Sequence, residues 1–246
     1  PRPEAYLLHM DAELSILAVE QFSNRARLIK QGGTGLLRVG AIGAAAFGLM
    51  PGLVARYTAG NPLVEIDLSV RSSHQISYLV GNGQCDIGLV EAPVAAPSLL
   101  AEQFSLPCVC IFPQGSELED KAQITPSDLA QHRLIGIQDS NQVDRQLRAV
   151  CAGAGFEMHA PVRGFFFAVV RRMVAEGAGI AIVDALNGCL PAQDGVCWRP
   201  FTPEIRYDTA LIVKAGAELS LPARAFIQMI RDEMQARGKL PDTAAV

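Results

Sequence analysis

The segment between residues 36 and 90 constrains the fold most, because it reads as a strand–helix–strand–helix–strand unit. Small residues from Gly43 onward open the first helix, and Ser72 or Ser73 can cap the second. Strands separated by helices predict a parallel sheet with right-handed crossovers. Ligands of such sheets bind in the crevice at the carboxyl ends of the strands. The predicted strands are residues 36–42, 64–70 and 85–90.

The second half of the chain repeats this scheme. With 246 residues, of which 50% are hydrophobic, the chain can bury the core of one large or two small α/β domains. We therefore expect two similar lobes with a cleft between them. The predicted strands here are residues 108–112, 134–137, 179–183 and 207–213, and the predicted helices are residues 142–152, 167–175 and 222–237.

A long helix is predicted to precede the first strand. From Glu4 to Lys30 the chain has no proline or glycine, and apolar residues form a stripe among charges. This pattern predicts a helix of about seven turns. The apolar stripe favours packing of this helix on a partner chain, and packing of the helix on its own lobe is the alternative. Glycines at residues 32, 33 and 35 end the helix.

Five phrases of the chain resemble, in order and approximate spacing, the effector-binding region of LysR-type transcriptional regulators. They are GLLRVG (35–40), LMPGLVARYTAGNPLVEIDL (49–68), LVGNGQCDIGLV (79–90), MVAEGAGIAIV (173–183) and LSLPARAFIQMI (219–230). The resemblance implies two Rossmann-like lobes joined by two crossover strands, as in type 2 periplasmic binding proteins. It implies a linker and dimerisation helix at residues 1–30, lobe I at 35–104 plus 206–246, and lobe II at 105–205.

The same resemblance implies a sensor that self-associates to a dimer or tetramer. The first residues of the chain resemble the start of the linker helix, so the winged helix-turn-helix domain that precedes this helix in the family is expected to be missing. Contact with DNA would be made only through that domain. Asp184 occupies a position at which a proline is more usual in this family. In this respect the segment 179–187 (GIAIVDALN) resembles the subgroup that responds to opines and related amino acids. The expected effector is a small amino acid, opine or other carboxylate.

Residues at the predicted strand ends of the first lobe are candidates for binding such a ligand. The backbone N–H groups of Gly43, Ala44 and Ala45 begin a helix and favour an anion, although small residues also permit close helix packing. Of Ser72 and Ser73, one can donate to a carboxylate while the other caps a helix. Glu91 follows a buried strand and can hold a cation, with an internal salt bridge as the alternative.

The second lobe contributes a polar segment, an aromatic side chain and a carboxylate. Polar residues whose side chains can donate and accept hydrogen bonds follow the strand at 134–137. They can contact a ligand, and capping of a helix is the alternative role. Phe166 is expected to line an apolar wall. Asp184 ends another strand and is a second candidate for a cation. Together these groups predict a zwitterionic ligand, and the polar segment consists of Gln138, Asp139, Ser140 and Asn141.

Composition excludes several other classes of protein. The net charge of −4 provides no overall basic field for nucleic acid. No apolar run reaches the roughly 20 residues that span a bilayer, and the first residues lack the pattern of a signal peptide, so we predict a cytoplasmic protein with no membrane partner. The six cysteines lack the spacing of a zinc site, which predicts buried free thiols, no metal and no cofactor.

Two alternatives share the predicted fold. A solute-binding protein would need export, for which no signal is found. An enzyme would need a catalytic motif, but neither a nucleophile elbow nor a metalloprotease, P-loop or dinucleotide motif occurs. Cys197 in GVCWRP has no partner base that the sequence identifies. We therefore predict no catalytic residues.

Overall fold

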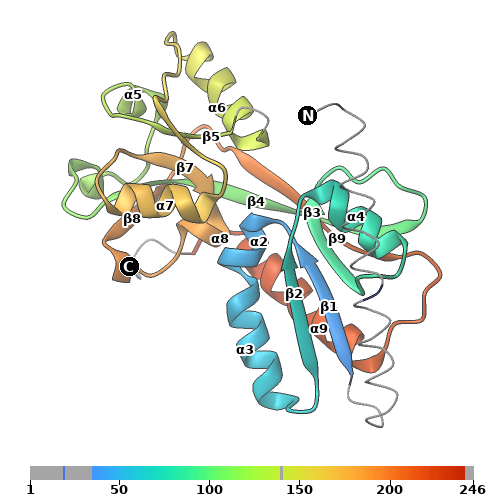
Figure 1. Ribbon diagram of the computed structural model, residues 1–246. Helices are drawn as coiled ribbons and strands as arrows, with labels where there is room; N and C mark the ends of the chain where they lie inside the picture. The colour runs from blue at the N-terminus through green and yellow to red at the C-terminus, as the bar shows by residue number, and fades with distance from the viewer. Residues whose placement is uncertain (1–18, 20–34, 139–140, 242–246) are drawn as a thin grey trace.

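The computed structural model describes residues 19, 35–138 and 141–241 (Figure 1). The predicted linker helix at residues 1–30 lies outside this part of the chain except for Val19. The site candidates Asp139 and Ser140 also lie outside the described residues.

The first lobe has a parallel sheet of three strands, as the sequence predicts. The central strand β1 has β2 on one side and β3 on the other, and both pairs are parallel. These strands are β1 (Leu36–Ala41), β2 (Glu65–Val70) and β3 (Ile87–Glu91). The helices of this lobe are α2 (Gly43–Gly48), α3 (Met50–Gly60), α4 (Ser73–Gly81) and α9 (Leu221–Arg237).

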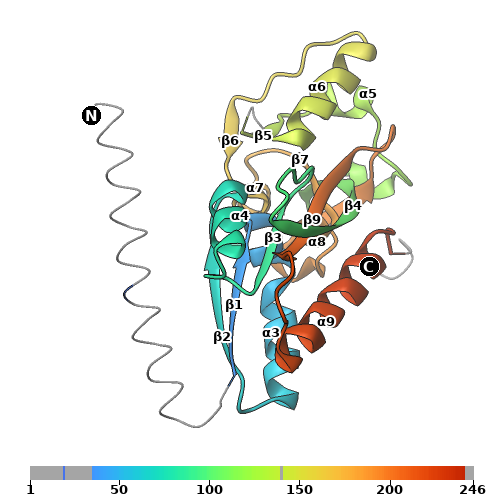
Figure 2. The ribbon, with the colours of Figure 1, turned by 90° about the vertical axis from the view of Figure 1, so that its right-hand side faces the viewer.

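The helix predicted from Gly43 to Tyr57 is divided into two. It breaks at Leu49, and Pro51 lies in the first turn of α3. A proline there is tolerated because the first N–H groups of a helix have no intrahelical acceptor. The second piece packs beside α9, where the rings of Tyr57 and Phe226 meet edge to face with centroids 5.1 Å apart (Figure 2).

Two long strands cross from one lobe to the other. They are β4 (Leu99–Pro113) and β9 (Arg206–Lys214), and they pair antiparallel along residues 99–107 and 206–214. Beyond this pairing β4 continues between two other antiparallel strands, β7 (Ala181–Asp184) and β8 (Val196–Pro200). The prediction of residues 108–112 captured only the apolar end of β4, because the half that pairs with β9 is more polar.

The second lobe repeats the strand order of the first. Two short strands, β5 (Ile135–Ile137) and β6 (Val162–Gly164), pair in parallel, and a parallel bridge between Leu134 and Ile180 places β5 beside β7. The order β6-β5-β7-β4-β8 thus matches the order β2-β1-β3-β9-β4. The helical elements here are η1 (Glu117–Asp120), α5 (Pro126–Leu129), α6 (Gln142–Gly153), α7 (Phe167–Ala175), α8 (Ala185–Gly188) and η2 (Ala192–Asp194).

This arrangement confirms the predicted fold class, two Rossmann-like lobes joined by two crossover strands. The sheets are mixed because the crossover strands run antiparallel to their neighbours. The six cysteines are free thiols, and four of them are buried as predicted, whereas Cys189 and Cys197 are only half-buried. Burial raises the pKa of Cys85 to about 11 and that of Cys189 to about 12. In the described part of the chain, no helix combines the length and apolar character needed to cross a membrane.

Candidate functional site

A cavity of about 570 Å³ lies between the two lobes, at the carboxyl ends of strands from both. β1, β2 and β3 lead into it from the first lobe, and β5 and β6 lead into it from the second. This is the crevice expected for open α/β sheets. The sequence candidates that line the cavity are Gly43, Ala44, Ser72, Ser73, Glu91, Gln138, Asn141 and Phe166.

Two predicted site residues do not line the cavity. Ala45 is the third residue of α2, and only 3% of it is exposed because the helix turns it into the core. Asp184 is fully buried, since a helix begins directly after β7 and the carboxylate caps it. Its Oδ1 accepts hydrogen bonds from the backbone N–H groups of Leu186 at 2.8 Å and Asn187 at 3.3 Å. The expectation that Asp184 binds a ligand cation is therefore wrong.

Four helices begin at this cavity, and only two of them have a side-chain cap. Ser72 caps α4 in a capping box with Gln75, and Asn141 Oδ1 accepts from Val143 N at 2.9 Å to cap α6. Among the described residues, no side chain caps α2 or α7, which begin at Gly43 and Phe167. The first N–H groups of a helix carry partial positive charge and attract anions. The cavity therefore favours a negatively charged group.

The structure separates the roles of the two serines. Ser72 is the helix cap, and its hydroxyl donates to Gln75 Oε1 at 3.1 Å. Ser73 Oγ instead accepts from Glu91 N at 3.0 Å. Among the hydrogen bonds of the described residues, the Ser73 hydroxyl hydrogen has no acceptor, so it can donate to a ligand.

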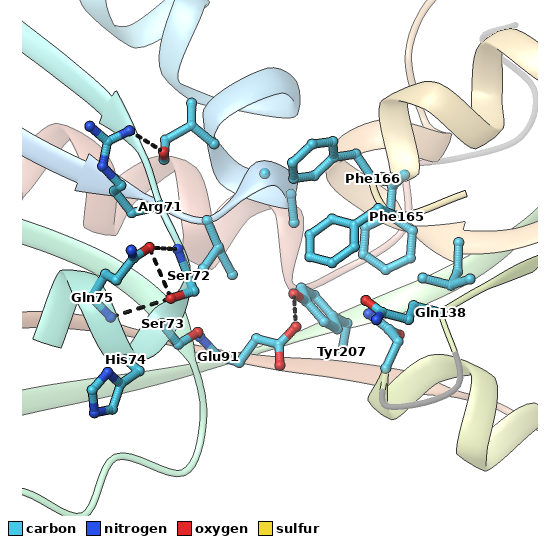
Figure 3. Close-up of a pocket in the computed structure, with 17 residues that line it drawn as sticks. Arg71, Ser72, Ser73, His74, Gln75, Glu91, Gln138, Phe165, Phe166 and Tyr207 are labelled. Atoms are coloured by element: carbon cyan, nitrogen blue, oxygen red, sulfur yellow. Dashed lines mark hydrogen bonds between the residues drawn. The ribbon is translucent and has the colours of Figure 1, made fainter. Parts of the chain in front are cut away.

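Glu91 places a carboxylate in the cavity. Its Oε1 accepts a hydrogen bond from Tyr207 Oη at 2.8 Å (Figure 3). Tyr207 is only 2% exposed, and this burial, together with the Glu91 charge, raises the pKa of its phenol well above the usual value. The phenol stays protonated and holds Glu91 in place. No protein donor to Glu91 Oε2 is found in the described part of the chain, which leaves this oxygen for a cationic group.

Aromatic rings form the wall opposite these polar groups (Figure 3). Phe166 meets Phe165 edge to face with centroids 4.9 Å apart and Phe47 at 5.4 Å. Phe165 is 64% exposed and also lines the cavity. A Cβ atom at Gly43 would come within 2.2 Å of the Phe166 ring, so the absence of a side chain allows this ring to pack directly on the start of α2.

Sequence reasoning missed several lining residues. Arg71 and Gln75 flank the serines, and the end of the second strand was a signal that could have identified both. His74 is exposed and also lines the cavity. Tyr207 gave no local signal, because it reaches the cavity only through the pairing of β9 with β4.

The buried Asp184 carboxyl predicts a pH-dependent stability. Burial raises its pKa from 3.8 to about 7, although hydrogen bonds from the Asn187 side chain and from backbone N–H groups of residues 184, 186 and 187 oppose the shift. Between these values the folded chain holds a proton that the unfolded chain has lost. The protonated Asp184 side chain therefore makes its full contribution to the free energy of unfolding below pH 4. This contribution falls as the pH rises from 4 to 7, by about 1.4 kcal/mol per pH unit at most, and is lost above pH 7.

Urea unfolding between pH 5 and 8 tests this expectation. The free energy of unfolding should fall less steeply with pH in Asp184→Asn than in the native chain, whatever the absolute stability of the variant. Equal slopes for the two proteins would contradict the assignment.

Comparison with known proteins identifies the family of the chain. The family model of the LysR substrate binding domain matches residues 30–235. The regulatory protein NocR of Agrobacterium tumefaciens (strain T37) is 25% identical over 237 residues, which are 96% of this chain and 79% of NocR. The octopine catabolism/uptake operon regulatory protein OccR of Rhizobium meliloti is 26% identical over 206 residues, covering 82% of this chain and 67% of OccR.

Solved structures show the same fold. HinK, a LysR family transcriptional regulator from Pseudomonas aeruginosa, matches with a TM-score of 0.68 and 18% identity over 95% of this chain and 81% of HinK. The match of the family model extends over most of the chain, including both lobes and the two crossover strands. The chain belongs to the LysR substrate-binding domain family, and it is the effector-binding region of a LysR-type transcriptional regulator.

Proposed function

We propose that this effector-binding domain senses an amino-acid-derived, opine-like zwitterion in the cavity between its lobes. The observation that carries the proposal is the opposite polarity of two neighbouring parts of the cavity. Uncapped helix N-termini at Gly43 and Phe167 favour an anion, while the Glu91 carboxylate favours a cation. A ligand with both charges satisfies both parts.

A ligand carboxylate has several donors at the start of α2 and α4. Gly43 and Ala44 line the cavity, and their backbone N–H groups belong to the first turn of α2, where a helix has no intrahelical acceptor. The hydroxyl hydrogen of Ser73 has no acceptor in the described chain. Arg71 at the rim adds a positive charge, and its guanidinium donates to Val70 O at 3.0 Å. This group of donors suits a carboxylate, and an opine with two carboxylates can use both the helix starts and Arg71.

The cationic part of the ligand would lie between Glu91 and the aromatic wall. A guanidinium or ammonium group pairs with a carboxylate and is attracted to the face of an aromatic ring. Glu91 Oε2 and the rings of Phe165 and Phe166 provide these two features. Gln138 and Asn141 supply amide groups from the second lobe. NocR and OccR are regulators of similar sequence, and OccR is the regulatory protein of an octopine catabolism and uptake operon.

Binding would act by changing the arrangement of the lobes, for which we propose the limits 35–104 with 206–246 and 105–205. A ligand shifts such an equilibrium only if it binds one arrangement more tightly. LysR-type regulators oligomerise, so the change would reach DNA through N-terminal domains in a dimer or tetramer in the cytoplasm. The proposed function involves no catalysis. The Cys197 thiol, the one nucleophile that the sequence suggested, is a poor nucleophile because burial and the Glu119 carboxylate raise its pKa.

Thermal unfolding with candidate effectors tests the proposal. At a concentration one hundred times the Kd, an effector should raise the free energy of unfolding by about 2.7 kcal/mol. Octopine or arginine should stabilise the chain in a dose-dependent manner. Benzoate, a carboxylate without a cationic group, is the matched control. Stabilisation by benzoate and none by octopine, arginine or other amino acids would refute the effector class and leave the family assignment intact.

A further inference from the structure

One end of the crossover strand β9 has an edge that no strand in the described part of the chain covers. β3 pairs with β9 as far as Glu91 opposite Thr209, and beyond this point no strand of the described chain pairs with residues 206–208 on that side. Unpaired backbone N–H and C=O groups are costly when water is excluded. The side chains of Gln142 and Gln146 on α6 provide their partners.

Each glutamine pairs with this edge through two hydrogen bonds. Gln142 Nε2 donates to Asp208 O at 2.8 Å, and its Oε1 accepts from Asp208 N at 3.0 Å. Gln146 Nε2 donates to Arg206 O at 2.7 Å, and its Oε1 accepts from Arg206 N at 3.3 Å. A glutamine amide has the same donor and acceptor as a peptide unit, so the two side chains take the place of a neighbouring strand.

The spacing of the two glutamines explains this match. Four residues of α-helix advance by about 6 Å, and two residues of β-strand advance by about 6.6 Å. Alternate residues of a strand direct their N–H and C=O groups to the same side. Side chains four residues apart on α6 can therefore form hydrogen bonds with backbone groups two residues apart on β9. These hydrogen bonds hold α6 against the crossover strand.

The Asp208 carbonyl also accepts a hydrogen bond from the first lobe. Ala92 N donates to it at 3.0 Å, so one oxygen is shared by Ala92 and by Gln142 of the second lobe. Each of the three residues at this junction directly follows a cavity residue in the sequence. The pairs are Glu91 and Ala92, Asn141 and Gln142, and Tyr207 and Asp208.

We propose that Gln142 is a positioning residue that couples occupancy of the cavity to the relative arrangement of the two lobes. Its amide joins the start of α6, where Asn141 lines the cavity, to the point at which the first lobe meets the crossover strand. A ligand that draws Glu91 and Asn141 together acts on Ala92 and Gln142 through one peptide bond each. The proposal rests on the proposed function in taking this cavity as the effector site.

Distance measurements in the absence of ligand test the positioning role. Nitroxide labels introduced through a non-canonical amino acid at Ala59 of α3 and Ala149 of α6, both exposed, report the separation of the lobes. Gln142→Ala should broaden the distance distribution. Gln146→Ala is the matched control, because it also loses two hydrogen bonds to β9 yet lies one helical turn farther from the cavity. Its distribution should remain that of the native chain.

Octopine titration by calorimetry provides the second measurement. Gln142→Ala should weaken binding about tenfold, and Gln146→Ala should leave it unchanged. Gln142→Glu keeps the acceptor for Asp208 N but places a carboxylate oxygen against the Asp208 carbonyl oxygen, so it breaks this hydrogen bond while keeping the side-chain volume and serves as the second variant if the alanine variant unfolds. Equal distance distributions for the two alanine variants would overturn the proposal. A native chain that does not bind octopine would count against the effector class alone, because the distance measurement still decides the role of Gln142.

Discussion

Replacement of Gly179 by alanine is expected to destabilise the protein by about 3 kcal/mol or more. Gly179 has a φ of +150°, and a Cβ atom there would lie 2.2 Å from the carbonyl oxygen of Arg133. That oxygen cannot move away without a loss, since it accepts a hydrogen bond from Ile180 N at 2.9 Å in the bridge that joins β5 to β7. The variant must distort the backbone or separate the two strands.

A second glycine of the same turn provides the control. Gly177 has a φ of +78°, and a Cβ atom there meets nothing within 4 Å. Gly177→Ala should cost only the strain of a positive φ, about 1 kcal/mol. Urea unfolding of both variants compares the two losses. Similar losses would show that backbone strain alone, rather than the contact with Arg133, requires glycine at residue 179.

Local patterns predicted most helices and strands because their apolar periodicity is strong. The helix at 167–175 is observed with the same limits as α7, and the helix at 222–237 is observed within one residue as α9. Three-residue β6 was missed because so short a strand has no periodicity, and its structure comes from pairing with β5. Strand β8 was missed because VCWRP is stabilised by the far end of β4 rather than by its own pattern.

The candidate site was predictable where it depends on strand ends and not where it depends on long-range contacts. The ends of β1, β2, β3 and β5 do line the cavity, as the crevice rule predicts. Glu91 and Asp184 are the last residues of equivalent strands of the two lobes, yet only Glu91 lines the cavity. The difference is the short helix α8, which begins at once after β7 and binds the Asp184 carboxylate, whereas no helix follows β3 directly.

The charge of Glu91 should determine which class of effector binds. Glu91→Gln is expected to weaken binding of octopine or arginine about one hundredfold, equivalent to about 2.7 kcal/mol, since a charge-assisted hydrogen bond in a partly buried site contributes about 1.5–3 kcal/mol. The substitution keeps an oxygen that accepts from Tyr207 Oη, so the side chain stays in place. Calorimetric titration of each ligand against both proteins measures the effect.

Two comparisons separate the charge of Glu91 from the shape of the site. Binding of benzoate, however weak, should not fall in Glu91→Gln, because a monocarboxylate has no cation to lose. Tyr207→Phe keeps the carboxylate and removes only its 2.8 Å hydrogen bond, so octopine binding should weaken less than tenfold. If Glu91→Gln weakened octopine and benzoate equally, Glu91 would be shaping the cavity through Tyr207 and Ser73 rather than pairing with a cation. The recognition of a zwitterion would then need another carboxylate, and no other acidic residue of the described chain lines this cavity.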